Sequence, residues 1–104
     1  MTFEQNIILK YGDLTINPLE QTVFYSDDEI VFTNREFEVL YLLLQYQGVV
    51  LSRQQIYEQI ADNDKDNYHT IEITISRIRK KLKVHTGRSD LIITVRDRGY
   101  KFRK

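Results

Sequence analysis

The sequence predicts an α+β fold in one small domain, with a sheet first, helices in the middle and a hairpin last. Residues 1–32 are short apolar and β-branched stretches separated by turn formers, as in an antiparallel sheet. Residues 33–84 repeat apolar side chains at helical spacing, as amphipathic helices do. Residues 91–103 return to two extended stretches around a glycine-containing turn. At 104 residues the chain has room for one modest core, so we expect a single domain over residues 1–104.

The charge of the chain is unevenly distributed, although the formal net charge is zero. Residues 1–67 hold four Lys/Arg and twelve Asp/Glu, a net charge of −8. Residues 68–104 hold eleven Lys/Arg and three Asp/Glu, a net charge of +8. Such a separation predicts one basic docking surface rather than a uniformly charged exterior.

The composition argues against several kinds of site. The chain has no cysteine, which excludes disulfides, thiolate chemistry and cysteine-based zinc sites. No apolar run approaches the roughly 20 residues of a membrane span, and residues 1–10 lack the basic-then-apolar order of a signal peptide. We therefore expect a cytoplasmic protein without a metal or a cofactor.

Four short strands are expected in residues 3–32, where they form an antiparallel meander. Turn formers at positions 12–13, 17–18 and 26–28 separate them. The adjacent acids at positions 27–29 are typical of a solvated turn rather than a metal site. The expected strands are residues 3–11, the stretch around Leu14 and Ile16, residues 22–25 and residues 29–32.

Two helices are expected next, each opened by a reciprocal capping pair. Thr33 with Glu36, and Ser52 with Gln55, are spaced so that each side chain can bond to the backbone N–H of the other. Gly48 is expected to end the first helix. The apolar positions are Phe37, Leu40, Tyr41 and Leu44, widened by Val39, Leu42 and Leu43, in the first helix, and Ile56, Tyr57 and Ile60 in the second. So broad an apolar face predicts that the first helix is covered on more than one side.

A third helix is expected over residues 67–84, with Asn67 as its N-cap. At about 100° per residue, Ile71, Ile75, Ile78 and Leu82 fall within one narrow stripe that faces the core. The opposite face holds Ile73, Arg77 and Lys80, and the flanks hold Thr70, Thr74 and Lys81 on one side and Glu72, Ser76, Arg79 and Lys83 on the other. A cationic face with hydroxyls and one isoleucine suits a partner lined with phosphates, base-edge acceptors and thymine methyls. We therefore interpret this helix as one that enters the major groove of DNA, although a solvated surface helix also explains the segment taken alone.

The last segment is expected to be a β-hairpin. Residues 91–95 are a dense β-branched strand, residues 96–99 a turn, and residues 100–102 alternate aromatic and basic side chains. Arg96 and Arg98 then lie near the tip, where arginine can enter the narrow minor groove of A·T tracts. Two helices joined by a loop, the second one basic, followed by such a hairpin, form a winged helix-turn-helix in which the hairpin is the wing.

From Thr33 onward, the chain resembles the winged-helix output domain of OmpR/PhoB-type response regulators. The stretches that carry the resemblance are FTNREFEVLYLLL, GVVLSRQQIYEQI, HTIEITISRIRKKL and TVRDRGYKF, which span most of residues 32–103 in order. The preceding strands fit the N-terminal sheet of that family. The resemblance implies a winged helix-turn-helix with an N-terminal four-stranded antiparallel sheet (1–32), three helices (33–84) and a C-terminal β-hairpin wing (91–103).

The resemblance also implies a transcription regulator of a bacterial two-component system that binds double-stranded DNA at direct-repeat sites. Members of the family pair head-to-tail, so we expect a dimer on DNA and a monomer as an isolated domain. Full-length members carry a receiver domain, the target of a sensor kinase, so we expect this chain to be an excised output domain with an added Met1. The loop before the third helix matches the segment that faces RNA polymerase; its candidate contacts are Asp62, Asn63, Asp64, Lys65 and Asp66.

By position, Ile73 and Arg77 resemble the base-contacting residues of the family. Arg96 resembles the wing arginine that reaches the minor groove, and Thr94 and Tyr100 fall at wing positions that contact the DNA backbone. The other candidates for contact with phosphates or bases are Thr70, Thr74, Ser76, Arg79, Lys80 and Lys81 on the helix and Arg98 in the wing.

Three positions depart from the family pattern. Ala61-Asp62 stands in place of a Trp-Gly pair at the end of the second helix, which puts the shape of the following loop in doubt. Asp97 replaces a glycine of the wing turn, and phosphate would repel its carboxylate. His69 replaces an arginine at the start of the third helix, which weakens one phosphate contact unless the imidazole is protonated.

Two other classes of function compete with DNA binding. A winged helix can serve as a protein–protein interaction module whose basic face meets an acidic partner; salt dependence and competition by duplex DNA distinguish that alternative. Catalysis has little support, because His69 and His85 are the only histidines, no nucleophile–base pair lies near them, and no glycine-rich phosphate loop occurs. We therefore do not expect an enzyme.

Overall fold

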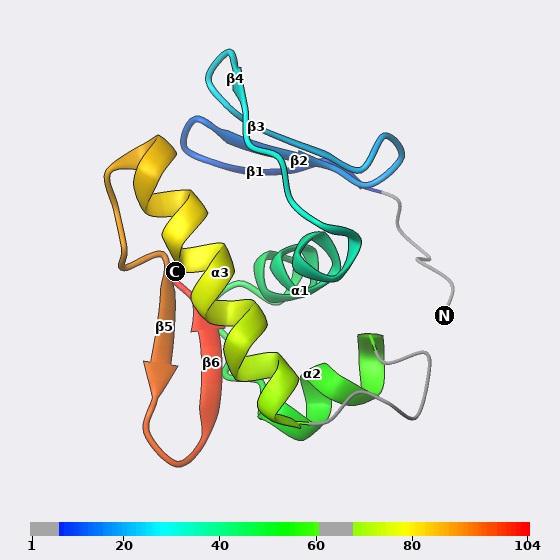
Figure 1. Cartoon of the computed structure of the whole chain (residues 1–104), viewed down its shortest axis with the longest axis vertical. Helices are drawn as coiled ribbons and strands as arrows, with labels where there is room; N and C mark the ends of the chain where they lie inside the picture. The colour runs from blue at the N-terminus through cyan, green and yellow to red at the C-terminus, as the bar shows by residue number, and fades with distance from the viewer. Residues whose placement is uncertain (1–6, 61–67) are drawn as a thin grey trace.

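The computed structural model describes residues 7–60 and 68–104. Within these segments a four-stranded sheet is followed by three helices and a two-stranded hairpin, which confirms the predicted order of elements (Figure 1). The strands of the sheet are β1 (Leu9–Tyr11), β2 (Leu14–Asn17), β3 (Thr22–Tyr25) and β4 (Asp28–Glu29). The other elements are α1 (Asn34–Gln45), α2 (Arg53–Ile60), α3 (Tyr68–Thr86), β5 (Ile92–Val95) and β6 (Gly99–Phe102). None of the helices in the described segments has the length and apolar content that crossing a bilayer requires.

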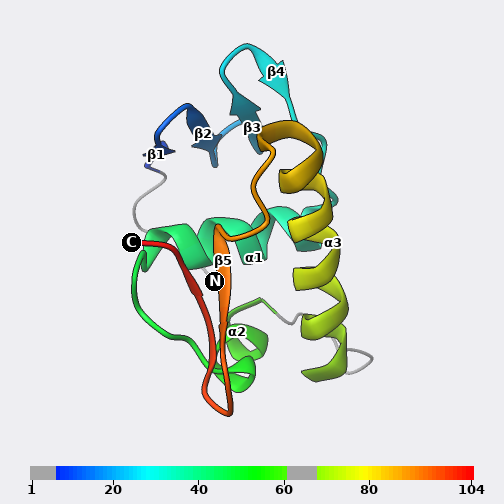
Figure 2. The same cartoon turned by 90° about the vertical axis from the view of Figure 1, so that its left-hand side faces the viewer.

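The N-terminal sheet is an antiparallel meander of order β1-β2-β3-β4 that lies on one side of α1. Figure 2 shows the same arrangement from another direction, with α2 on the opposite side of α1. Leu14, Ile16 and Val23 are buried and alternate along β2 and β3 with more exposed neighbours. One face of the sheet therefore packs into the core, as the period-two pattern predicts.

The first and last strands of the sheet are shorter than predicted. β4 contains Asp28–Glu29, whereas the prediction continued to residue 32. Ile30 still donates its backbone N–H to the Val23 carbonyl at 2.8 Å, and its side chain is buried. The chain then leaves the sheet because Thr33 has to reach the N-terminus of α1. Of the predicted strand at residues 3–11, the described part is a strand only at Leu9–Tyr11.

α1 begins at the predicted capping box. The Glu36 N–H donates to Thr33 Oγ1 at 3.2 Å, and the Thr33 N–H donates to Glu36 Oε1 at 2.9 Å. The helix ends at Gln45 with Tyr46 as its C-cap, so Gly48 lies beyond the end rather than forming it. The buried residues of α1 occur around most of its circumference, which agrees with the prediction of cover on more than one side: Phe37, Val39, Leu40, Tyr41, Leu42, Leu43 and Leu44.

α2 and α3 also follow their sequence patterns. In α2, the Ser52 N–H donates to Gln55 Oε1 at 2.8 Å and the Gln55 N–H donates to Ser52 Oγ at 3.0 Å, which confirms the second capping box. The predicted stripe of α3 is buried at Ile71, Ile75, Ile78 and Leu82. α3 continues two residues past the predicted end at 84, to Thr86, and the Gly87 N–H donates to the Lys83 carbonyl at 2.8 Å to close the last turn. The predicted N-cap, Asn67, lies outside the described residues.

The hairpin of β5 and β6 is held to the helices by the link between α1 and α2. Leu51 exchanges two backbone hydrogen bonds with Tyr100 of β6, at 2.8 and 2.9 Å. Gly99 lies directly against this link and has φ +142°, and a Cβ at this position would lie 2.0 Å from the Leu51 carbonyl oxygen. The close approach therefore requires glycine, and it holds the turn-proximal end of β6 near the start of α2.

Candidate nucleic-acid interface

The face of α3 opposite its buried stripe carries side chains that were predicted to contact DNA. Ile73 is 40% exposed, and Ser76, Arg77 and Lys80 are exposed. Residues three and four apart are neighbours on a helix surface, so Ile73, Ser76, Arg77 and Lys80 form one continuous strip. This strip combines two cations, a hydroxyl and an apolar group, as the sequence predicts.

The wing extends toward the same end of the molecule as the N-terminal half of α3. Figures 1 and 2 both show the hairpin turn, α2 and the start of α3 at this end. Arg96, Asp97 and Arg98 are all exposed in the turn, which the Arg98 N–H closes by donating to the Val95 carbonyl at 2.9 Å. Asp97 has φ +63°, in the left-handed region where the family pattern has glycine and where Asp is tolerated.

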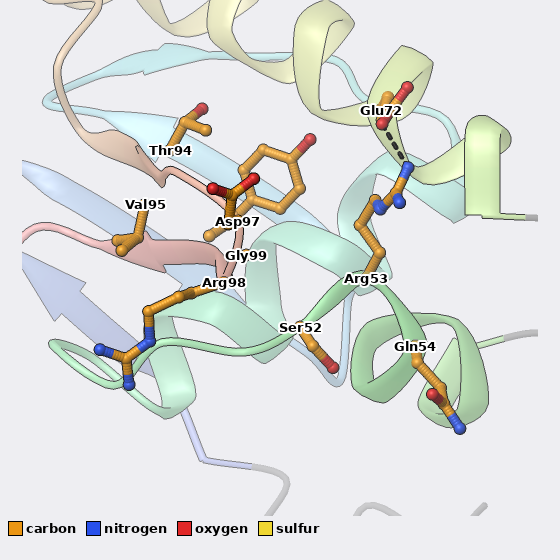
Figure 3. A pocket seen from close by; sticks show the side chains of 10 residues that line it. Ser52, Arg53, Gln54, Glu72, Thr94, Val95, Asp97, Arg98 and Gly99 are labelled. Carbon is orange, nitrogen blue, oxygen red and sulfur yellow. Dashed lines mark hydrogen bonds and ion pairs between the residues drawn. The ribbon is translucent and has the colours of Figure 1, made fainter.

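A groove of about 560 Å³ separates the wing from the helices at this end. Figure 3 shows it bounded by the start of α2 at residues 52–54, by Glu72 of α3 and by wing residues between 94 and 100. Its walls carry charged and polar side chains of both signs, including Arg53, Arg98 and Asp97. The polar lining is more suitable for a charged, hydrated partner than for an apolar ligand.

The single acid of α3, Glu72, lies beside the basic strip and is paired. Arg53 Nη1 of α2 donates to one oxygen of Glu72, as Figure 3 shows, and His69 Nδ1 lies 3.2 Å from the other. The hydrogen bond with His69 and the charge of Arg53 together lower the pKa of the Glu72 carboxyl, despite its partial desolvation. Sequence reasoning missed Arg53. The lone acid on a basic face was the available signal, since such an acid needs a cation from another element.

Arg79 is directed at the wing. Its Nε and Nη2 donate to the Ile92 carbonyl at 3.1 and 2.9 Å, and Nη2 also donates to Thr94 Oγ1 at 2.6 Å. The guanidinium carbon lies 5.8 Å from the centre of the Tyr100 ring. Burial lowers the pKa of Arg79 and raises that of Tyr100. Arg79, Thr94 and Tyr100 were predicted as DNA contacts, and the structure brings them together as contacts between α3 and the wing.

Thr74 was predicted on a flank of the third helix as a candidate DNA contact, but it is buried. Its side chain is 5% exposed, and its hydroxyl donates to the Thr70 carbonyl at 2.8 Å. Thr74 lies three residues after Ile71 and four before Ile78, so it shares their side of the helix. The buried stripe of α3 is therefore wider than the apolar residues alone indicated, because α1 and α2 both pack on this helix.

Lys81 is likewise engaged within the domain rather than placed on the strip. Its Nζ lies 2.6 Å from Glu36 Oε1 and 5.4 Å from the centre of the Phe32 ring. Burial disfavours the charged form of Glu36, but hydrogen bonds from Lys81 and from the Thr33 backbone outweigh it and lower the pKa of this carboxyl. The structure thus places the Lys81 ammonium at the junction of α3 and α1, and its contact with DNA stays a prediction.

Some of the predicted features cannot be placed in the structure. The Ala61-Asp62 replacement lies outside the described residues. The same holds for the candidate polymerase contacts Asp62, Asn63, Asp64, Lys65 and Asp66. Within residues 7–60 and 68–104, no group of three or more His, Asp or Glu side chains is arranged to hold a metal ion.

Comparison with known proteins places this arrangement in a family. A family profile described as "Transcriptional regulatory protein, C terminal" matches residues 27–102. The transcriptional regulatory protein CiaR of Streptococcus pneumoniae is 34% identical over 99 residues, which are 94% of this chain and 43% of CiaR. The chain spans about two fifths of the length of the curated relatives it matches.

Solved structures agree with the sequence match. The DNA-binding domain of RstA from Klebsiella pneumoniae, crystallised in complex with the RstA box, has a TM-score of 0.77 and 26% identity, covering 92% of this chain and 96% of that one. The response regulator DrrB of Thermotoga maritima, described as an OmpR/PhoB homolog, has a TM-score of 0.81 and 29% identity, covering 93% of this chain and 44% of that one. Sequence and structure together show that the chain belongs to the C-terminal winged-helix domains of OmpR/PhoB-type transcriptional regulatory proteins.

Proposed function

We propose that this chain binds duplex DNA with sequence preference, with α3 in the major groove and the wing in the adjacent minor groove. The observation that carries the proposal is the exposed strip of Ile73, Ser76, Arg77 and Lys80. It lies on the face of α3 opposite the buried stripe, and the wing turn that carries Arg96 and Arg98 is at the same end of the molecule as the start of α3. An α-helix fits the width of the major groove, and its exposed strip then faces the base edges.

The side chains of the strip suggest separate tasks. Arg77 can donate two parallel hydrogen bonds to guanine O6 and N7, and Ile73 can pack against a thymine methyl group. Lys80 is a point charge suited to a phosphate, while Ser76 can donate to a phosphate or a base. Arg96 at the wing tip is placed to enter a narrow minor groove, where the potential is most negative. Affinity then comes mainly from phosphate contacts, and the choice of site from Arg77 and Ile73.

The comparison with RstA supports the proposal. A domain of nearly the same length and fold was crystallised in complex with a DNA element, the RstA box. The pairing of Glu72 with Arg53 also favours DNA, since it compensates the one acid of α3 that would otherwise repel phosphate.

We further propose that the chain acts as the output domain of a two-component response regulator in the cytoplasm. In that setting a receiver domain, phosphorylated by a sensor kinase, controls head-to-tail pairing on direct repeats, and the segment of residues 61–67 meets RNA polymerase. The proposal is supported by the match to relatives such as CiaR, of whose length the chain covers 43%. Pairing on tandem half-sites adds avidity, so the isolated domain is expected to bind weakly as a monomer.

The experiment that tests the proposal is selection from a pool of random DNA duplexes by the purified domain at two salt concentrations. The expected result is a motif of two direct half-sites about one helical turn apart, with weaker binding at higher salt. Salt-sensitive retention without a motif would contradict sequence preference and favour a module that docks an acidic protein partner on its basic face. A tethered dimer run in parallel shows whether weak monomer affinity alone hides the motif.

A further inference from the structure

We propose that Arg79 is a positioning residue that holds the outer strand of the wing against α3, so that both elements meet DNA in one fixed arrangement. The inference rests on the proposed function. It gives Arg79 a role other than the phosphate contact expected from its place on a basic helix. Three observations support this role: the hydrogen-bond partners of the Arg79 guanidinium, the topology of the wing, and the partial burial of the Arg79 side chain.

The guanidinium of Arg79 connects α3 to both strands of the wing. Its three hydrogen bonds end on the Ile92 carbonyl and the Thr94 hydroxyl, which both belong to β5. The same group lies over the ring of Tyr100, which belongs to β6. The planar fork of arginine allows two N–H groups to reach one carbonyl while a third reaches a hydroxyl, and the single ammonium of lysine cannot reproduce this geometry.

β5 is the strand that needs such an anchor. In the described part of the chain, β6 pairs with β5 on one edge and with Leu51 on the other. β5 is therefore the outer strand of the hairpin, and the Arg79 hydrogen bonds satisfy its Ile92 carbonyl. α3 itself packs mainly on α1 and α2. The hydrogen bonds of Arg79 join this helix directly to the outer strand.

Burial separates Arg79 from the cations of the exposed strip. Arg79 is half-buried and its pKa is lowered by desolvation, whereas Arg77 and Lys80 are exposed. Moving a guanidinium partly out of water is unfavourable unless fixed acceptors compensate, and the oxygens of Ile92 and Thr94 provide that compensation. A side chain whose main task is to meet phosphate has no need of this environment.

The first test needs no ligand and therefore does not depend on DNA binding. Residual dipolar couplings of backbone amides report the orientation of β5 relative to α3 in the free domain. In Arg79→Ala and Arg79→Lys we expect the β5 amides to depart from the common alignment and to exchange with solvent faster, while the α1 and α3 amides keep their values. Lys80→Ala, which removes an adjacent exposed cation, is the matched control and leaves β5 unchanged. Unchanged β5 amides in Arg79→Ala would overturn the proposal.

The second test measures whether this link matters for DNA. In a double-mutant cycle, Arg79→Ala is combined with Arg96→Ala, a wing-tip residue that lies outside the contacts of Arg79, on a duplex recovered by the selection. We expect the double variant to bind at least about threefold more tightly than independent losses predict, because either change already removes the ordered wing contact. Lys80→Ala combined with Arg96→Ala should be additive. Additivity for Arg79, or near-normal affinity in Arg79→Lys, would show a phosphate contact instead.

The two tests also separate the failure of this inference from that of the proposed function. A domain that binds no duplex but loses the orientation of β5 in Arg79→Ala would refute DNA binding and leave the structural link in place. A domain that binds DNA but keeps the orientation of β5 in Arg79→Ala would support DNA binding and refute the structural link. If Arg79→Ala fails to fold, Thr94→Val removes one acceptor of the fork at nearly constant volume and is expected to shift the β5 amides in the same direction by a smaller amount.

Discussion

Lys81 and Glu36 form an ion pair of 2.6 Å that joins the C-terminal half of α3 to the first turn of α1. The carboxylate is 4% exposed, and its oxygen Oε1 also accepts the Thr33 N–H that begins α1. A residue from the basic half of the sequence therefore completes the cap of a helix in the acidic half. This pair adds a polar contact between α3 and α1 to the packing of the buried stripe of α3.

Lys81→Met should destabilise the domain by about 1–3 kcal/mol, because it leaves a buried carboxylate with fewer donors while keeping an apolar stem of similar length. Lys80→Met is the control, since Lys80 is exposed on the next position of the same helix. The measurement is urea unfolding of both variants. Equal midpoints for the two variants would contradict a structural role for the pair.

The same pair predicts a pH dependence of stability. The pKa of Glu36 is lowered in the folded domain, so the unfolded chain binds its proton at higher pH than the folded one. The contribution of Glu36 is therefore complete above its unfolded pKa, near the ordinary value of 4.5, and is lost as the pH falls through the lower folded pKa. The difference in unfolding free energy between wild type and Glu36→Gln should shrink across this acidic range. A difference that stays constant there would argue against the pair as its source.

Gly99→Ala should cost on the order of 3 kcal/mol, because the new methyl group would meet the Leu51 carbonyl oxygen and break the link between the wing and α2. Gly87→Ala is a matched control: Gly87 also has a positive φ, +77°, but a Cβ there meets nothing within 4 Å. Its cost should be limited to about 1 kcal/mol of backbone strain. Thermal unfolding of both variants checks the prediction, and equal losses would show that the close approach is unimportant.

Asp97→Asn should tighten DNA binding several-fold at low salt, since it removes a negative charge from the wing turn while Asn tolerates the left-handed backbone at φ +63°. The gain should decrease as salt concentration rises. Asp27→Asn, in the turn before β4 and also exposed, is the control and should leave affinity unchanged. Fluorescence anisotropy with a labelled duplex gives both values. No gain for Asp97→Asn would place the wing tip away from phosphate.

Local patterns in the sequence predicted most of the fold. The two capping boxes depend on residues three positions apart, and the stripe of α3 depends on a period fixed by helix geometry. The sequence alone therefore predicts the capping boxes and the stripe. The end of the last sheet strand was not, because it depends on where Thr33 must lie to cap α1. The strand propensity of nearby residues does not indicate how far the chain must run from the sheet to the start of α1.

The candidate site was predicted less completely, for a related reason. Periodicity identified the exposed strip around Arg77, yet it treated Arg79 and Lys81 as equivalent cations. Their partners, the Ile92 carbonyl and Glu36, lie 13 and 45 residues away in the sequence. Tertiary packing brings these partners together, so charge alone did not distinguish a cation that faces solvent from one that holds two elements together.

Base recognition by α3 is tested most directly by selection of random duplexes with the wild-type domain and with Arg77→Ala, followed by comparison of base preferences at each position. We expect Arg77→Ala to lose preference at one step of each half-site, with a cost of roughly 1–3 kcal/mol there, and to keep the remaining preferences. An equal loss of affinity on every sequence, with the preferences of the wild type intact, would contradict base recognition by the exposed strip of α3.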